Sequence, residues 1–367
     1  MRILYGVVGE GMGHATRSRV ILEELIKEHE VQVVASGRAH AYLAERFPDV
    51  HRIWGFTLHY EGNAIRRLPT LLRNLRGAVS GWPRNVRAYF ELVASFRPDV
   101  VVSDFESFSY YFGKAHGIPV IDLDNIHVIS KCRHSPELLR GHEHDFGLVR
   151  NVVAAKLPHC FHYVIPTFFY PPVRARRTTL VPPVLRPEIL AARAETGGHL
   201  LVYQTATTNR ALPEVLKRLG MPARVYGLRR DLTDDVVDGN VTHRPFGEER
   251  FIEDLRTARA VVAGGGFTLM SEAVFLHKPM LCVPVERQFE QVLNALYLQE
   301  LGYGTHARRL DEATLGAFLE RIPEHARTLA DYHQEGNTVA LATVKEQLAQ
   351  VSARRGRRRR RTEAVRD

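Results

Sequence analysis

The sequence predicts an α/β protein built from two doubly wound parallel sheets, and two observations support this fold class. Short apolar runs alternate with amphipathic stretches through most of the 367 residues, which is the pattern of repeated strand–helix units. The alternation stops at residues 171–187, where five prolines interrupt any period, and resumes at residue 199. We therefore expect two domains whose strand ends face a central cleft, where ligands of such sheets bind.

Each element of the first half follows from its local pattern. Short apolar runs bounded by turns predict strands at 3–8, 31–36, 51–56, 100–104 and 119–124. Helices are expected at 14–29, at 38–47, at 64–97 with breaks at Pro69 and Pro83, and at 106–116. In the first of these helices Ile21, Leu22, Leu25 and Ile26 share one face.

The second half repeats the pattern. Strands are predicted at 199–205 and 223–228, a strand–glycine–helix unit at 261–294, and closing helices near 311–350. We assign residues 1–172 to the first domain, 173–187 to a linker, 188–348 to the second domain and 349–367 to a disordered tail.

Composition excludes several classes of protein. Apolar residues make up 45% and charged residues 25% of the chain, as in ordinary globular proteins. No apolar run approaches the ~20 residues that span a bilayer, and the N-terminal apolar stretch is typical of a core strand rather than a secretion signal. The three scattered cysteines fit buried thiols in a reducing compartment. We therefore expect a cytoplasmic protein.

The positive charge is concentrated at the C-terminal end. From residue 349 onward there are eight arginines and two acids, so this segment carries six of the nine net positive charges. The run Arg354–Arg361 has no apolar partner for a core, which predicts disorder. Peripheral contact with anionic lipid at the inner face of the membrane and a merely solvated tail are equal alternatives, and specific nucleic-acid binding is not expected.

Residues 261–294 carry the strongest chemical signal. An apolar strand runs into the glycines Gly264–Gly266, and a helix starts at once with one acid, Glu272, in its second turn. Such a turn binds anions, because free N–H groups and the positive end of the helix dipole face the same point. A carboxylate one and a half turns further on can accept hydrogen bonds from two vicinal hydroxyls. Phosphate and diol together predict a nucleotide.

A second helix follows in the same segment. It bears Glu290, Gln291 and Asn294, and this mixture of donors and acceptors suits a sugar ring.

The first strand leads into a different glycine turn, Gly9–His14. A dinucleotide fingerprint needs a glycine where His14 stands, so we expect no NAD site here. An imidazole with its ordinary pKa of ~6.5 suits a general base at neutral pH, and Asp104 ends a strand at the same sheet edge. The alternatives are a surface or capping histidine, and an aspartate that caps the helix from Glu106.

Three further patterns are weaker. Asp122 and Asp124 match the D-x-D shape of some metal-dependent sugar-nucleotide enzymes, but we interpret them as loop and capping residues and expect no metal. The hydroxyls of Thr205, Thr207 and Thr208 precede a helix and offer either phosphate contacts or ordinary capping. Arg244 and Phe246, after a short strand, offer a guanidinium or ring face to a base.

With these residues identified, the chain resembles a glycosyltransferase of the GT-B architecture, in which two Rossmann-like domains face a cleft. It is similar to the group that includes MurG and the plant and bacterial UDP-glycosyltransferases. The resemblance rests on the tract from Gly264 to Asn294 with Pro279 and Pro284, on residues 97–104 with 117–119, and on the turn formed by Gly11, Met12, Gly13 and His14.

The resemblance implies a role for each of these residues. His14 would be the acceptor-side base with Asp104 as its partner, in a loop with Gly11, Met12 and Gly13. Donor binding would fall to Gly264, Gly265, Gly266, Phe267, Thr268, Glu272, Glu290, Gln291, Thr205, Thr207, Thr208, Arg244 and Phe246. Among these, Glu272 would hold the ribose. The plant signature has His and Cys where this chain has Gly264 and Gly265, and Trp at Phe267, so a bacterial-type enzyme is expected.

The activity implied is transfer of a hexosyl group from a nucleotide diphosphate sugar, UDP by resemblance, to an acceptor hydroxyl that is lipid-linked or soluble. We expect inversion, no metal and no cofactor. Two alternatives stay open. One is a UDP-sugar 2-epimerase or hydrolase on the same fold, although those have paired acids where Ser271-Glu272 has one. The other is a non-catalytic membrane- or nucleic-acid-associated protein that acts through its arginine tail.

Overall fold

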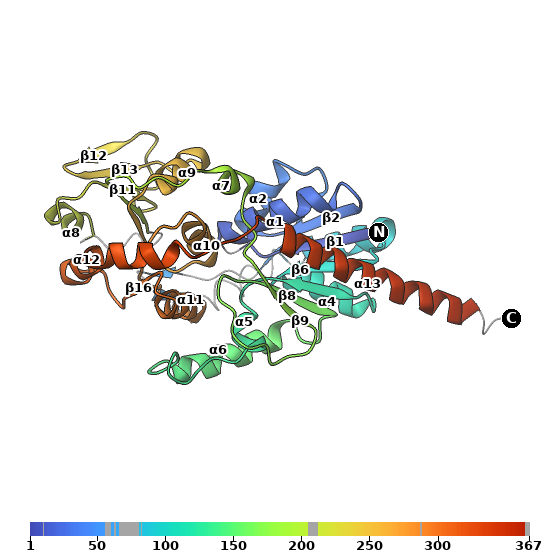
Figure 1. The fold of residues 1–367 in the computed structure, drawn as a ribbon. Helices are drawn as coiled ribbons and strands as arrows, with labels where there is room; N and C mark the ends of the chain where they lie inside the picture. The colour runs from blue at the N-terminus through green and yellow to red at the C-terminus, as the bar shows by residue number, and fades with distance from the viewer. Residues whose placement is uncertain are drawn as a thin grey trace.

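The computed structural model describes residues 1–9, 11–55, 60–61, 64–65, 81, 83–204, 212–286 and 288–363. Two seven-stranded sheets form two lobes, each flanked by helices, and the lobes meet along one side (Figure 1). The predicted α/β class with two doubly wound sheets is therefore confirmed.

The first sheet has the order β3-β2-β1-β6-β7-β8-β9, and all of its paired strands are parallel. Its strands are β1 (Arg2–Val7), β2 (Glu30–Ala35), β3 (Val50–Arg52), β6 (Val100–Asp104), β7 (Val120–Leu123), β8 (His162–Pro166) and β9 (Thr178–Val181). The central strand β6 is buried at every residue, which explains its unbroken apolar run. The strand order reverses between β1 and β6, and this switch point is where such sheets bind ligands.

The helices of this lobe are α1 (Met12–Leu25), α2 (Gly37–Ala44), α4 (Ser107–Ala115), α5 (Val128–Lys131) and α6 (Glu143–Lys156), with a π-helical turn at Leu92–Phe96. A small hairpin, β4 (Tyr60–Glu61) and β5 (Ala64–Ile65), stands where a helix was expected to begin. Residues 66–80 and 82 of that expected helix lie outside the described residues, whereas 83–91 are helical as expected and run into the π-helical turn.

The second sheet has the order β12-β13-β11-β10-β14-β15-β16, parallel except for the pair β12–β13. Its strands are β10 (Leu200–Tyr203), β11 (Ala223–Tyr226), β12 (Val236–Asp238), β13 (Val241–Arg244), β14 (Ala260–Ala263), β15 (Met280–Cys282) and β16 (Gly304–His306). Its helices are α8 (Leu212–Arg218), α9 (Glu248–Arg256), α10 (Phe267–Phe275), α11 (Phe289–Glu300) and α12 (Glu312–Leu329). Here the order reverses between β10 and β14.

The expected linker is shorter in the structure than in the sequence. Strand β9 lies inside residues 173–187 and pairs with β8, so the crossover between sheets begins after Val181 and includes the short helix α7 (Pro187–Ala191). Prolines lie on both sides of this edge strand, where proline is tolerated. They interrupt the apolar pattern, so the sequence did not indicate a strand here.

The expected tail also differs. Helix α13 (Thr338–Glu363) continues through most of 349–367, so that segment is not disordered as far as residue 363. Val344, Leu348 and Val351 of this helix are buried in the core of the first lobe, not the second. Arg355 pairs with Asp99 at 2.8 Å. The helix crosses the first lobe and ends beyond it (Figure 1).

The three cysteines are free and buried, as predicted. Among the described residues, no helix combines the length and apolar character needed to cross a bilayer.

Candidate active site

The turn after β1 and the end of β6 bring His14 and Asp104 together at the first switch point. Nδ1 of His14 lies 2.7 Å from Oδ1 of Asp104. Because a carboxylate only accepts hydrogen bonds, this contact requires the proton on Nδ1 and leaves Nε2 as the acceptor. The His14 side chain is 17% exposed and Asp104 is fully buried. The pair thus has the geometry of an oriented general base.

Asp104 is also held by two neighbours from the same helix as His14. Arg17 donates to its Oδ1, and the Ser18 hydroxyl donates to Oδ2 at 3.0 Å. The capping alternative for Asp104 is wrong, because Glu106 caps α4 by accepting from the N–H groups of Phe108 and Ser109. The Asp104 side chain therefore does not cap α4, and it binds His14, Arg17 and Ser18 instead.

The glycine turn after β14 has the backbone of an anion site. Gly266 is the N-cap residue of α10 and, as a glycine, makes no side-chain cap. Gly265 has φ +90°, and a side chain there would also collide with the Gln291 backbone at 2.9 Å. The Asn294 side-chain amide donates to the Gly265 carbonyl at 3.3 Å, and the side-chain Oε1 of Gln291 accepts from the Val285 N–H at 3.0 Å. Asn294 thus braces the glycine turn, whereas the Gln291 side chain binds the segment after β15, which differs from the sugar contact expected of it.

The first turns of α1 and α10 face each other across the lobes. A methyl group on Gly13 would lie 2.4 Å from Oγ1 of Thr268, so the two turns are in contact. Both helices start from a glycine, Gly11 at φ +81° and Gly266, so neither N-cap residue supplies a side-chain cap. Two uncapped N-termini direct the positive ends of two helix dipoles to one place, which favours an anion there. Figure 1 shows both helices at the junction of the lobes.

The lobes pack through aromatic rings beside this point. Phe267 is buried and its ring stacks on Phe168, with centroids 6.0 Å apart and planes 10° apart. The Phe267 ring therefore packs between the lobes, and only the backbone of this residue could contact a diphosphate. Tyr297 stacks on Phe169 at 4.1 Å and hydrogen-bonds His134 at 2.8 Å.

Glu290, on α11, is brought to the His14 cluster. Burial raises the pKa of the Glu290 carboxyl. The charges of Asp124, Arg17 and Asp104 also act on it, so this residue of the second lobe lies near the base of the first.

Glu272 does not present an open carboxylate. It is 2% exposed, and its two oxygens accept from Arg186, with Nε–Oε1 at 2.7 Å and Nη2–Oε2 at 2.8 Å. The expected ribose contact stays a prediction, and it requires Glu272 to exchange guanidinium hydrogen bonds for hydroxyls.

Arg244 also differs from the expectation. The N–H edge of its guanidinium is paired with Asp235 at 2.8 Å and Asp254 at 2.7 Å, and its side chain is only 12% exposed. Phe246 is 63% exposed and remains available for stacking. Thr205, Thr207 and Thr208 lie outside the described residues.

Asp122 and Asp124 form a fully buried group with His127. Nδ1 of His127 lies 2.8 Å from Asp122 and 2.7 Å from Asp124. The contact with Asp124 is a hydrogen bond, and the contact with Asp122 is an ion-pair contact. Burial alone would lower the pKa of His127, but the two acids raise it to about 10. The loop-and-cap interpretation was wrong for Asp122, whereas Asp124 does accept from the His127 N–H.

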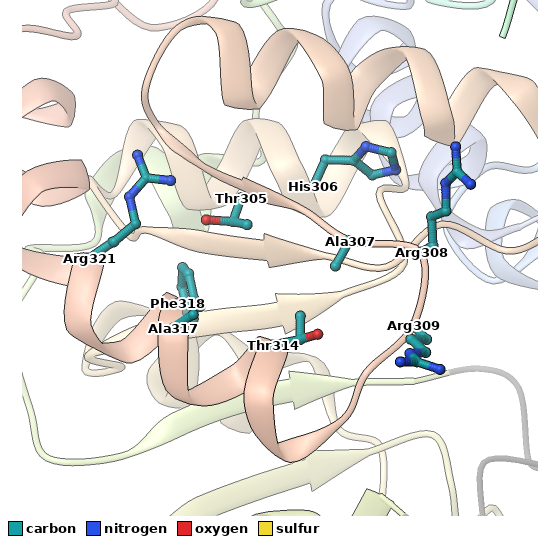
Figure 2. A pocket seen from close by; sticks show the side chains of 9 residues that line it. All are labelled: Thr305, His306, Ala307, Arg308, Arg309, Thr314, Ala317, Phe318 and Arg321. Atoms are coloured by element: carbon teal, nitrogen blue, oxygen red, sulfur yellow. The ribbon is translucent and has the colours of Figure 1, made fainter. Parts of the chain in front are cut away.

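A separate hollow of about 390 Å³ lies on the second lobe between β16 and α12. Figure 2 shows Arg321 at one end and Arg308 with Arg309 at the other, over an apolar floor that includes Phe318. None of the residues predicted for the site lines it, and it lies at the edge strand rather than at the switch point.

Comparison with known proteins identifies the class to which this geometry belongs. Residues 1–323 match the family described as glycosyl transferase family 1. The chain belongs to this family. An uncharacterized glycosyltransferase of Methanosarcina mazei is 25% identical over 345 residues, covering 83% of this chain and 85% of the relative. A second, from Methanosarcina acetivorans, is 24% identical over 341 residues, with the same shares covered.

Solved structures share the fold of this glycosyltransferase. The glycotransferase of kitacinnamycin superposes with TM-score 0.68 at 18% identity, covering 95% of this chain and 99% of that one. Phytolacca americana UGT2, complexed with UDP-2fluoro-glucose and pterostilbene, superposes with TM-score 0.64 at 12% identity, covering 96% and 99%. The enzyme is thus a GT-B glycosyltransferase, as the resemblance implied.

Sequence reasoning missed three residues around the transferase site. Arg17 and Ser18 follow His14 by one helical turn, and that spacing was the available signal. No local sequence pattern indicated Arg186, because its partner Glu272 is 86 residues away.

Proposed function

We propose that this glycosyltransferase moves a hexosyl group from a UDP-sugar to an acceptor hydroxyl, without a metal and with inversion at the anomeric carbon. The observation that carries the proposal is the meeting of two uncapped helix N-termini, at Gly13 and Thr268, beside the His14–Asp104 pair. This arrangement joins an anion site to a base across the two lobes.

The second lobe would stabilise the leaving group. As the glycosidic bond breaks, charge accumulates on the diphosphate. Backbone N–H groups of Gly264, Gly265, Gly266, Phe267 and Thr268 would hold that charge, together with the α10 dipole. Fixed dipoles of this kind act without a metal ion, which supports a metal-independent reaction.

The first lobe would activate the acceptor. Nε2 of His14 is the free nitrogen of the ring, so it would take the proton of the attacking hydroxyl. Asp104 holds the ring and stabilises the imidazolium that forms. Attack from the lobe opposite the leaving group displaces the diphosphate directly, which predicts inversion.

Glu272, Glu290 and Phe246 would complete the donor site. In our proposal Glu272 accepts from the ribose, Glu290 lies close to the sugar that reacts near His14, and Phe246 offers its exposed ring to the base. UDP is favoured because two proteins of similar fold carry it in their structures, UGT2 as a UDP-sugar analogue and LpCGTa as UDP.

The test is release of the nucleotide from a panel of UDP-, GDP- and dTDP-sugars with candidate acceptors, followed by NMR of the product anomer. We expect UDP release that depends on an acceptor, and an inverted anomer. Conversion of the donor sugar without any acceptor favours the epimerase or hydrolase instead. A retained anomer contradicts direct displacement.

We also propose that α13 contacts an anionic membrane surface. This helix ends beyond the first lobe, and its last turns carry the arginine run (Figure 1). Arg354, over the Phe161 ring, and Arg355 bind the body of the protein, and the arginine run continues in the sequence through Arg357–Arg361. Sedimentation with phosphatidylglycerol vesicles, against neutral vesicles, tests this. Replacement of Arg357–Arg361 by glutamine should abolish binding, at about 1 kcal/mol per arginine.

A further inference from the structure

Arg186 ties the crossover between the lobes to the second lobe. It precedes α7, is largely buried, and forms the bidentate pair with Glu272 on α10. Paired N–H donors on both oxygens fix the carboxylate firmly. Burial raises the pKa of the Glu272 carboxyl, and the Arg186 guanidinium opposes this rise.

Arg186 has a second acid within reach. Its Nη1 lies 2.9 Å from Oε1 of Glu248, on α9. If Glu272 is taken by another partner, the guanidinium keeps an ion pair and is not left as a buried, unpaired charge, which would be costly. The pair with Glu272 can therefore open at moderate cost.

The same network reaches the first lobe. Arg19, on α1, binds Glu188 through two contacts of 2.8 and 2.7 Å and lies 3.8 Å from Glu248. Arg19 belongs to the helix that carries His14. A change at Glu272 is thus connected, through Arg186 and Glu248, to the helix that carries the base.

We infer that the Arg186–Glu272 pair is a latch that the ribose diol of the donor opens. This rests on the proposed function, since it takes Glu272 as the ribose acceptor. The two hydroxyls would replace the two guanidinium donors on Glu272, and Arg186 would remain on Glu248. Donor binding then releases the linker from α10, so occupation of the second lobe alters how the lobes are tethered.

The latch predicts a competition that can be measured. Glu272 is available to the diol only in the fraction of molecules whose pair is open, and apparent affinity falls by that fraction. With a minor state of at most about 10%, removal of the competitor should strengthen binding of a ribose-bearing ligand about tenfold or more.

The experiment is calorimetric titration of wild type and Arg186→Gln with UDP and with 2′,3′-dideoxy-UDP. We expect Arg186→Gln to bind UDP about tenfold more tightly, with no gain for the dideoxy compound. Glu188→Gln is the matched control, because it breaks a linker ion pair but leaves the latch, and its UDP affinity should equal that of wild type. Unchanged or weaker UDP binding by Arg186→Gln, or an equal gain for the dideoxy compound, overturns the latch.

A second measurement uses the wild-type protein, so the test of the latch does not depend on whether Arg186→Gln folds. Hydrogen exchange of Pro187–Ala191 in the wild-type protein should become faster when UDP is added, since the linker loses one tether. Unchanged or slower exchange overturns the latch. If wild-type protein binds no nucleoside diphosphate at all, the proposed function itself fails, and the two failures are thereby distinguished.

Discussion

His14 and Asp104 stand 90 residues apart in the chain, yet Nδ1 of the histidine lies 2.7 Å from Oδ1 of the aspartate. Parallel pairing of β1 with β6, which places Val7 beside Asp104, creates this contact. The aspartate fixes the ring through Nδ1, and in the proposed mechanism Nε2 would receive the proton of the acceptor. If His14 is the base, replacement of either residue should have a measurable effect.

Replacement of His14 by alanine removes the proposed base. We expect turnover with a UDP-sugar and acceptor to fall about 10²- to 10⁴-fold, the usual contribution of a general base. UDP affinity should change little, because the proposed donor contacts do not include the His14 side chain. The exposed His333 provides the control, since its replacement by alanine should leave turnover intact. Wild-type turnover in His14→Ala would show that the base has been misassigned.

Asp104→Asn leaves Arg17 buried without its counter-ion. Loss of one partner of a buried ion pair costs about 3–5 kcal/mol of folding free energy. The double variant Asp104→Asn/Arg17→Gln should recover part of that loss, because no unpaired charge remains. Urea unfolding of the single and double variants measures the coupling. Asp231→Asn, in an exposed pair with Arg229, should change stability little, and an equally small loss for Asp104→Asn contradicts a buried charge pair.

The His127 cluster predicts a pH dependence of stability. The pKa of His127 is about 10 in the folded protein, above the ordinary ~6.5 of an unfolded chain. Its contribution is therefore fully present below pH ~6.5 and is lost as pH rises toward 10. Between these values, wild type should lose more stability than His127→Gln in urea unfolding. His333→Gln is the control, and parallel curves for wild type and His127→Gln would disprove the shifted pKa.

Gly13→Ala tests the contact between the lobes. Alanine normally stabilises a helix by about 0.5–1 kcal/mol over glycine, but here its methyl would lie 2.4 Å from Oγ1 of Thr268. We expect weaker donor binding and a larger radius of gyration in X-ray scattering, because the lobes must separate. Gly147→Ala, in α6 with open space around it, should show neither effect. A compact Gly13→Ala protein with normal donor affinity means the two turns need not meet.

The sequence predicted what local pattern controls. Apolar runs such as Val100–Asp104 gave the strands, and the glycines after β14 gave the anion turn. It could not predict which side chains each acid meets. From the sequence, Glu272 was expected to be open to a ligand and Asp122 to be a loop or capping residue. In the fold they contact Arg186 and His127, and tertiary packing sets these partners. Strand β9 was missed because prolines flank it, although it pairs with β8. The helical tail was missed because its arginine run indicated disorder, although α13 packs in the core of the first lobe.

The most direct test is the thermal unfolding temperature of the full-length protein with UDP, GDP, dTDP and orthophosphate. A ligand that binds only the folded state adds about 2.7 kcal/mol at a hundredfold excess over its dissociation constant. If the facing turns of α1 and α10 hold a nucleotide diphosphate, UDP should raise the unfolding temperature by several degrees, while orthophosphate at the same concentration should not. No rise with any of the three nucleotides would contradict the account.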